Sequence, residues 1–306
     1  MMARYIARRV LEATLTLLAV GFATFGLLHA LPYNLAAIMA GPTAPPAVVA
    51  QVARKMGLNL PLPAQFGLWL RQLAATGLPL AARFAPLTLE LLVLGSVLAA
   101  VAAFAMAFAQ ARRPNSLIDR AASLAAYVAY ALPSFWVGFV LIYVFALQLL
   151  WLPATGPNLD PSSQGIANWA TEMVLPAMTL ALSTIALWLT YFGGAIEEAL
   201  HSEYVRTARA KGLSEGRVIL AHVLRNALLP AITIAGMSLP TLFNNVIVVE
   251  WVFAMQGLGS ELIYSLTGFD YSRAVDLVMV IGAFTILGSL VADLLYALAD
   301  PRIKFS

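Results

Sequence analysis

Apolar residues gather along the chain in runs of roughly 20, the length that a helix needs to cross the hydrocarbon core of a bilayer. The runs predict about six membrane spans, near residues 9–31, 87–110, 121–151, 172–195, 227–253 and 274–298. The third run is long enough to be broken, and Pro133 is the predicted break. The pattern therefore predicts an all-α integral membrane protein.

The first run resembles a secretory signal peptide, because Arg4, Arg8 and Arg9 precede it. A signal peptide has a shorter apolar core followed by a cleavage site of small residues. This run is about 20 residues long and lacks such a site. We therefore expect an uncleaved first span.

Composition agrees with a membrane protein. Hydrophobic residues make up 61% of the chain and charged residues 11%, against about 25% charged in soluble domains. The chain has no cysteine, which excludes disulfides, iron–sulfur clusters and thiolate metal sites. No internal repeat and no low-complexity tract is visible.

The basic residues predict the orientation, because Lys and Arg are concentrated in cytoplasmic loops. With the N-terminus inside, 13 of the 18 Lys and Arg residues fall on the cytoplasmic side and 5 on the other side. Four of those five lie in one long segment, where this rule is weak. We therefore expect both termini in the cytoplasm.

The spans divide the chain into three regions: the N-terminus with the first span (1–31), an extracytoplasmic cap (32–86), and a transmembrane core (87–306). Prolines interrupt the cap, and short helices are expected near 46–56 and 64–75. Val48, Val49 and Val52 form an apolar stripe, so the cap is expected to be ordered.

The predicted cytoplasmic loop 197–226 contains an unusual polar stretch, with seven charged residues and a histidine between Glu203 and Arg225. Glu203 to Lys211 can form a short helix that Gly212 would end in a left-handed conformation. Ser214 is the expected N-cap of a second helix, with Glu215 in its first turn. The apolar side of that helix would consist of Val218, Ile219, Val223 and Leu224, before Pro230 opens the next span.

Two interpretations of this stretch stay open from the residues alone. It can be a basic loop with amphipathic helices on anionic lipid. It can also dock a cytoplasmic partner, because Ala208 and Ala210 permit close approach while Arg206, Arg209 and Lys211 offer charge-assisted contacts.

Motifs spread along the chain decide between the lipid-binding and the partner-docking interpretation. The loop reads Tyr204-Val205-Arg206-Thr207-Ala208-Arg209-Ala210-Lys211-Gly212-Leu213 and then Arg225-Asn226-Ala227-Leu228-Leu229-Pro230. Other segments are Leu132-Pro133-Ser134-Phe135-Trp136-Val137-Gly138, Trp151-Leu152-Pro153-Ala154-Thr155-Gly156, Val174-Leu175-Pro176-Ala177, Val249-Glu250-Trp251-Val252-Phe253-Ala254, Gly257-Leu258-Gly259 and Asp293-Leu294-Leu295-Tyr296-Ala297-Leu298-Ala299-Asp300-Pro301-Arg302-Ile303-Lys304. Together these segments resemble the permeases of ABC importers in the peptide/nickel family, the "B" type of the oligopeptide and dipeptide systems.

The resemblance covers nearly the whole chain and implies the type I ABC importer permease fold in a bacterial inner membrane. It implies that the loop contains a coupling helix, which seats in a groove of an ATP-hydrolysing subunit. The contact residues implied are Glu203, Tyr204, Arg206, Thr207, Ala208, Arg209, Ala210, Lys211, Gly212, Leu213, Ser214 and Arg217.

The resemblance also implies three protein partners: a second related permease, cytoplasmic ATPase subunits that use ATP and Mg, and an extracytoplasmic solute-binding protein. This chain has no G-x-x-x-x-G-K-[ST] phosphate loop, so it is expected to be a non-catalytic subunit without a cofactor of its own. Apart from membrane lipid, no further partner is expected, and no nucleic acid.

Three segments depart from the family pattern. Leu31-Pro32-Tyr33-Asn34 stands where the family has Gly-Asp-Pro, Met255-Gln256 replaces Trp-Pro, and the stretch Thr76 to Pro86 is short. All three lie on the expected outer face, where cargo is delivered.

Polar residues inside the predicted spans are the candidates for a translocation path, because buried charge is costly in a membrane. We expect Ser134, Ser183, Ser238, Asn244, Asn245 and Glu250 to line it or to bridge helices. Glu90 is a further candidate for the path or for a buried pair, and Asp293 also falls within or at the end of a span. Glu12 and Asp276 lie near span ends, where either can reach water. His29, His201 and His222 are isolated, and no metal site is expected.

Two other classes of protein compete with an ABC permease. A secondary transporter driven by an ion gradient usually shows internal repeats, and a membrane-embedded enzyme needs clustered reactive side chains. Neither feature is visible. The cargo is predicted to be a small peptide on family frequency, with nickel or a metal chelate as the alternative.

Overall fold

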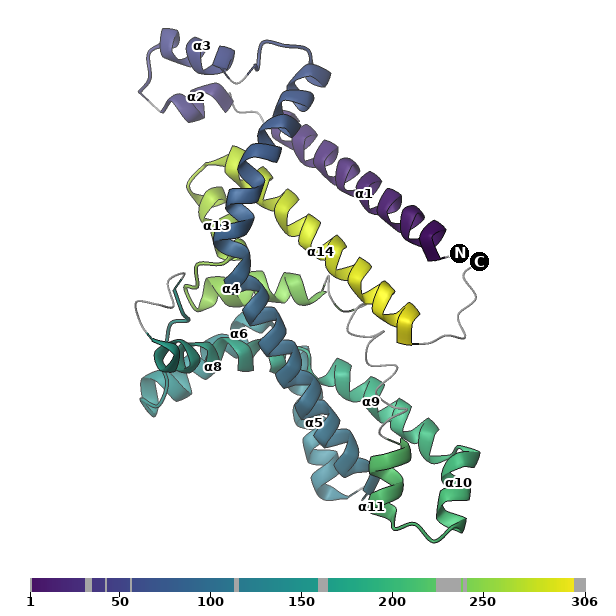
Figure 1. Ribbon diagram of the computed structural model, residues 1–306. Coiled ribbons are helices and arrows are strands. Elements are labelled where there is room, and N and C mark those ends of the chain that lie inside the picture. Colours follow the sequence, from purple (N-terminus) through teal and green to yellow (C-terminus); the bar gives the residue numbers. More distant parts are fainter. Residues whose placement is uncertain are drawn as a thin grey trace. The chain divides into compact units, whose positions relative to one another are not determined.

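The computed structural model describes residues 2–30, 35–41, 43–55, 57–112, 116–158, 165–223, 238 and 241–299 (Figure 1). These parts of the chain are helical and contain no strand. The longer helices are α1 (Met2–Ala30), α4 (Leu62–Arg112), α5 (Leu117–Ala131), α8 (Ile166–Leu182), α9 (Ile185–Leu200) and α14 (Tyr271–Ala299). The shorter ones are α2 (Leu35–Ala40), α3 (Pro46–Lys55), α6 (Ser134–Leu141), α10 (Glu203–Ala210), α11 (Glu215–Val218) and α13 (Leu258–Thr267), with π-helical turns η1 (Ile142–Gln148) and η2 (Ile219–Val223).

Among the residues that the structure describes, three unbroken helices are long and apolar enough to cross a membrane, and the number rises to five if each of two bent pairs is one span. The unbroken spans lie within α1, α4 and α14. Of the sixth predicted span, 227–253, the structure describes Ser238 and a short apolar helix over Thr241–Val252. The helical class of the prediction is therefore confirmed, and the count of six stays a prediction.

The predicted break at Pro133 is confirmed. α5 ends at Ala131, and Leu132 and Pro133 are both extended before α6 begins at Ser134. The two halves of this span differ in direction by 112°. The residue before a proline is driven away from the helical region, which explains why the helix ends here.

The prediction of two short helices in the cap was half right. The first, 46–56, corresponds to α3. The second, 64–75, is wrong as a separate element, because it is the beginning of the 51-residue helix α4, which also contains the span 87–110. Pro79 and Pro86 lie inside α4 without ending it. A proline removes one backbone donor, and a packed helix tolerates this loss where neighbouring groups compensate.

Contacts within the chain define two compact units. The first consists of Met1–Pro86 and Gly257–Ile286, and the second of Leu87–Gln256 and Leu287–Ser306. In the first unit, Phe25 of α1 stacks edge-on against Phe66 of α4, with 5.4 Å between ring centroids. Phe66 in turn contacts Trp69 at 5.5 Å. Large aromatic side chains therefore join α1 to the beginning of α4.

Asp276 corrects an expectation. It lies in α14 and was expected to reach water, but its side chain is only 4% exposed. The hydroxyl of Thr76 donates a hydrogen bond to its Oδ2 at 2.7 Å, and the indole N–H of Trp69 donates to its Oδ1 at 3.2 Å. A buried carboxylate needs such donors, so Asp276 joins α14 to α4 within the first unit.

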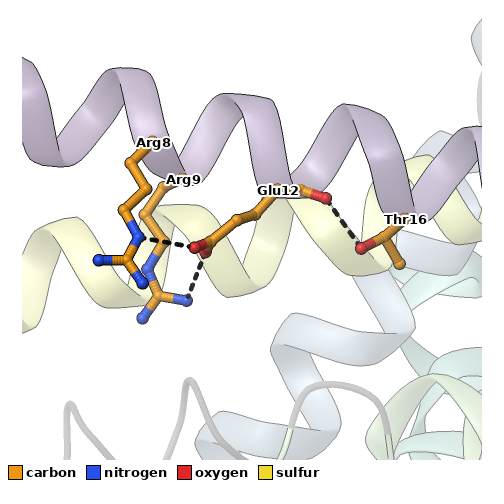
Figure 2. Close-up of polar contacts among 4 residues, drawn as sticks. All are labelled: Arg8, Arg9, Glu12 and Thr16. Atoms are coloured by element: carbon orange, nitrogen blue, oxygen red, sulfur yellow. Dashed lines mark hydrogen bonds and ion pairs between the residues drawn. The ribbon is translucent and has the colours of Figure 1, made fainter.

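Glu12 is neutralised within its own helix. Figure 2 shows its carboxylate between Arg8, at 2.9 Å, and Arg9, at 3.8 Å. All three side chains are exposed, and the spacings of three and four residues place them on one face of α1. That Glu12 lies within reach of water stays a prediction.

The second unit has a core made of small residues on α4 and large ones on α9. Ala99, Ala103 and Ala107 lie in the same buried cluster as Trp188 and Phe192. Gly95 continues this face of α4, and a Cβ atom there would lie 2.6 Å from Cδ2 of Leu180 on α8. The helices therefore approach each other through small side chains, as is usual in membrane proteins.

Gly95→Ala should lower the stability of the protein, because the added methyl group overpacks the contact with Leu180 at a cost of about 1–3 kcal/mol. The matched control is Gly193→Ala in α9, where a Cβ would meet nothing within 4 Å. That control should be neutral or stabilising by up to about 1 kcal/mol. Thermal unfolding in detergent, followed by tryptophan fluorescence, measures both. Equal midpoints for the two variants would contradict the close packing of α4 on α8.

Candidate functional site

The polar stretch around residue 203 forms a compact helical turn-back after α9 (Figure 1). α9 ends at Leu200, and the hydroxyl of Ser202 donates to the carbonyl of Ala199 at 2.6 Å. Ser202 has an extended backbone at the N-cap of α10, and its own carbonyl accepts from Val205 and Arg206. The chain therefore passes from α9 into α10 through a tight, hydrogen-bonded turn.

α10 is anchored by its inner face. Val205 is fully buried and Ala208 nearly so, and three residues separate them, so they lie on one side of the helix. Both belong to the buried cluster that contains Ile196 of α9 and Val223 of η2. The small side chain of Ala208 therefore packs against this chain's own core, whereas Ala210 is exposed.

The predicted left-handed ending at Gly212 is confirmed, with φ +77°. The N–H of Gly212 donates to Arg209 O at 2.9 Å, and the N–H of Leu213 donates to Ala208 O at 3.4 Å. This pair of bonds is the Schellman ending of a helix. Leu213, partly buried against the same cluster, supplies the hydrophobic contact that accompanies it.

The second helix of the stretch also agrees with the prediction. α11 begins at Glu215, and the carbonyl of Ser214 accepts from Arg217 and Val218. Val218, Ile219 and Val223 are buried, which confirms the apolar side. Leu224 and Pro230 lie outside the described residues.

The outer face of the stretch is charged and exposed. Arg206 pairs with Glu203 at 2.7 Å on the surface, and such exposed pairs contribute little to stability. The exposed residues of the candidate contact set are Glu203, Tyr204, Arg206, Thr207, Arg209, Ala210, Lys211, Gly212, Ser214 and Arg217. A short rigid helix with buried anchors and an outer face rich in cations is suited to binding a partner through charge-assisted contacts.

Sequence reasoning missed Val205 as the main anchor of α10. The signal was present, because Val205 and Ala208 are apolar positions three residues apart in an otherwise charged helix. Ala208 was predicted to face a partner, whereas it faces the core of this chain.

The residues predicted for a translocation path do not share one exposed surface. Asn244 is exposed, whereas Ser134 and Asn245 are half-buried. Ser183, Ser238 and Glu250 are buried. The hydroxyl of Ser183 donates to Thr179 O at 2.8 Å, which engages it within its own helix. A role for these residues in a path stays a prediction.

The structure also describes the exposure and contacts of three other polar candidates. Glu90 is exposed, so it forms no buried pair with the part of the chain that the structure describes. His29 contacts Gln65 Oε1 at 2.8 Å and Phe25 O at 2.9 Å, and His201 contacts Glu197 O at 2.9 Å. The side chains of His222 and Asp293 lie outside the described residues, which contain no group of three or more His, Asp or Glu that could hold a metal ion.

The replacement Met255-Gln256 has a clear packing consequence in the second unit. Met255 is fully buried, and a Cβ at Gly156 would lie 2.4 Å from its Cγ. The N–H of Gly156 also donates to Phe253 O at 2.8 Å. The loop after η1 is therefore held against the turn after the helix Thr241–Val252. Leu31-Pro32-Tyr33-Asn34, another departure from the family pattern, lies outside the described residues.

Comparison with known proteins shows the family. The sequence pattern described as "Binding-protein-dependent transport system inner membrane component" matches residues 78–305, and the corresponding N-terminal pattern matches residues 2–82. The chain belongs to this family of inner membrane transport components. It is therefore a multi-pass protein of the bacterial inner membrane, and the suspected resemblance to peptide ABC permeases is confirmed.

Named relatives align along almost their entire length. The chain is 34% identical to the probable peptide ABC transporter permease protein y4tP of Sinorhizobium fredii, over 98% of this chain and 99% of the relative. It is 33% identical to the oligopeptide transport system permease protein AppB of Bacillus subtilis, over 99% and 100%. The glutathione transport system permease protein GsiC of Salmonella choleraesuis is 33% identical over the same shares.

Gly212→Ala should loosen the polar stretch, because an L-residue in the left-handed region costs roughly 1–2 kcal/mol. Gly216→Ala is the matched control, since Gly216 has no positive φ and nothing within 4 Å of its Cβ position. Limited trypsin digestion of the protein in nanodiscs, with cleavage after Arg206 and Arg209 followed by mass spectrometry, should be about five- to thirtyfold faster in the first variant. Equal rates would contradict a Gly212-dependent ending of α10.

Proposed function

We propose that this protein is the permease subunit of an ATP-driven importer and forms half of the translocation pore for small peptides. A solute-binding protein on the outer side would deliver the peptide, and a second, related permease would complete the pore. The observation that supports the proposal best is the full-length alignment with permease subunits named for peptides, oligopeptides and dipeptides.

A peptide is the preferred cargo because of those names, to which GsiC adds glutathione, itself a peptide. No specific observation favours nickel or a metal chelate. The ion-gradient alternative loses its support, since the family takes its name from dependence on a binding protein.

The energy for transport would come from cytoplasmic ATPase subunits that bind ATP and Mg. In this proposal α10 is the coupling helix and seats in a groove of the ATPase. Arg206, Arg209 and Lys211 would contact the partner, while Val205 and Ala208 would transmit its movement into the buried cluster around α9. The absence of a phosphate loop from the sequence supports a non-catalytic subunit.

The coupling role is tested by reversing two charges, Arg206→Glu together with Arg209→Glu. Each lost charge-assisted contact is worth about 1.5–3 kcal/mol, so peptide-stimulated ATP hydrolysis should fall at least about tenfold. Arg54→Glu with Lys55→Glu is the control, because it makes the same charge change at the end of α3. Normal stimulation in the first variant, with the protein inserted in the membrane, would remove α10 from the coupling role.

The composition of the transporter is tested by affinity purification of this chain from its native membrane in mild detergent, followed by mass spectrometry. An ATPase and a second permease should be recovered with it. Competition for uptake between a labelled dipeptide and a nickel chelate then tests the cargo. Recovery of the chain alone or as a homodimer, without an ATPase, would contradict the proposal.

A further inference from the structure

The apolar pair α8 and α9 forms one candidate span that is bent by 57°. The break lies at Ser183 and Thr184, between the end of α8 at Leu182 and the beginning of α9 at Ile185. Both residues are buried, with exposed fractions of 6% and 2%. Backbone groups freed by a break inside a membrane protein must find other partners.

The hydroxyl of Thr184 supplies such a partner. It donates to Leu180 O at 2.9 Å and lies 3.3 Å from Ala181 O. The backbone N–H of Thr184 donates instead to Ala181 O at 3.1 Å. Thr184 therefore occupies the N-cap position of α9 without capping it, because its hydroxyl reaches back to the last turn of α8.

This exchange of partners gives the break two possible geometries. In a straight α-helix the N–H of Thr184 would itself donate to Leu180 O, four residues back. In the bent form the hydroxyl takes the place of that N–H. The same kind of hydroxyl bond occurs inside α8 at Thr179. At Thr184 its particular effect is to keep Leu180 O bonded after the backbone N–H has moved to Ala181 O, in keeping with the bends that accompany such Ser and Thr bonds.

The bend at Pro133 is different in kind. There the residues on either side of the break are extended, and proline holds its own φ near −57°. Ser183 has φ −68° and ψ −10°, whereas Thr184 has φ −126° and ψ −11°, and neither is a proline. Rotation of the Thr184 φ by about 60° would return the break to a helix. No ring prevents this rotation, whereas the proline ring fixes φ at Pro133.

Both arms of the bend pack on α4, and the α9 arm also shares a buried cluster with the polar stretch. Near the end of α8, Leu180 packs on Gly95 of α4, and the methyl group of Thr179 lies beside Gly138 of α6. Phe192 of α9 contacts Phe104 of α4, and it belongs to the cluster that also holds Val205 of α10 and Val223 of η2. α9 is about 24 Å long, so a change of about 10° at the break moves its far end, and α10 with it, by about 4 Å.

We propose that Ser183 and Thr184 form the hinge through which movement of α10 changes the angle between α9 and α8, and that Thr184 is the positioning residue that favours the bent form. This inference rests on the proposed coupling role of α10. It also assigns to Ser183 a part in the bend in place of the predicted part in a translocation path. The hydroxyl of Ser183 stabilises the bent form less than that of Thr184 does. The backbone N–H of Ser183 already donates to Thr179 O, the same acceptor that its hydroxyl uses.

The first test compares Thr184→Val with Thr179→Val in the complete transporter with its ATPase, reconstituted in nanodiscs or vesicles. Both substitutions remove a buried hydroxyl bonded four residues back at 2.8–2.9 Å. At Thr179 the bond lies inside α8, where Leu175 O keeps its helical partner. Thr184→Val should lower the peptide transported per ATP hydrolysed about fivefold, the effect of one hydrogen bond. Thr179→Val should leave that ratio unchanged, and the ratio for Ser183→Ala should lie between those of the other two variants.

The second test measures the bend directly. The chain has no cysteine, so Asn168→Cys and Glu198→Cys can place spin labels on exposed positions of α8 and α9. The distance distribution between the labels should differ between the nucleotide-free and the vanadate-trapped transporter. Thr184→Val should shift it toward longer distances in both, because straightening separates the labels.

The outcomes separate the hinge from the proposed function. Failure of the ATPase to bind would overturn the proposed function and the hinge with it. With the ATPase bound and stimulated by peptide, unchanged label distances or equal coupling ratios for Thr184→Val and Thr179→Val would overturn the hinge alone.

Discussion

Every backbone N–H and C=O group inside a bilayer must be hydrogen-bonded within the protein, because the hydrocarbon offers no partner. This requirement makes the spans helical and leaves only a few ways to break them. At Pro133 the chain leaves the helix through two extended residues. At Thr184 a side-chain hydroxyl takes over a carbonyl that the backbone released. At Gly212, in the polar stretch, a left-handed residue closes α10 with two backbone bonds.

The polar stretch after α9 is likewise stabilised by contacts within the protein. A helix of eight residues is too short to be stable alone in water, and α10 has only Val205 and Ala208 to bury. Its stability therefore comes from the shared cluster with α9, α11 and η2. The anchors are apolar and the outer face is charged. In the proposed coupling role, the charged face would contact the ATPase while the anchors hold α10 on α9.

Polar side chains within the apolar helices serve mainly to hold the structure together where the contacts are described. Asp276 receives hydrogen bonds from Trp69 and Thr76, and Glu12 is held by two arginines. Burying a charged side chain in a membrane costs free energy, so such a residue suggests a transport function. A nearby hydrogen-bond donor can also offset that cost. Ser183 illustrates the same point, since its hydroxyl is engaged by its own helix.

Periodicity and residue type were enough to predict the helical class, the break at Pro133, the left-handed Gly212 and the apolar side of α11, because each depends on local backbone chemistry. The motifs were enough to predict the family. The joining of 64–75 and 87–110 into α4 and the burial of Asp276 required the tertiary structure. Asp276 is buried because α4, a helix far from it in the sequence, supplies the hydroxyl and indole donors to its carboxylate. Contacts between residues far apart in the chain leave no periodic mark in either partner's sequence, so packing alone decides them.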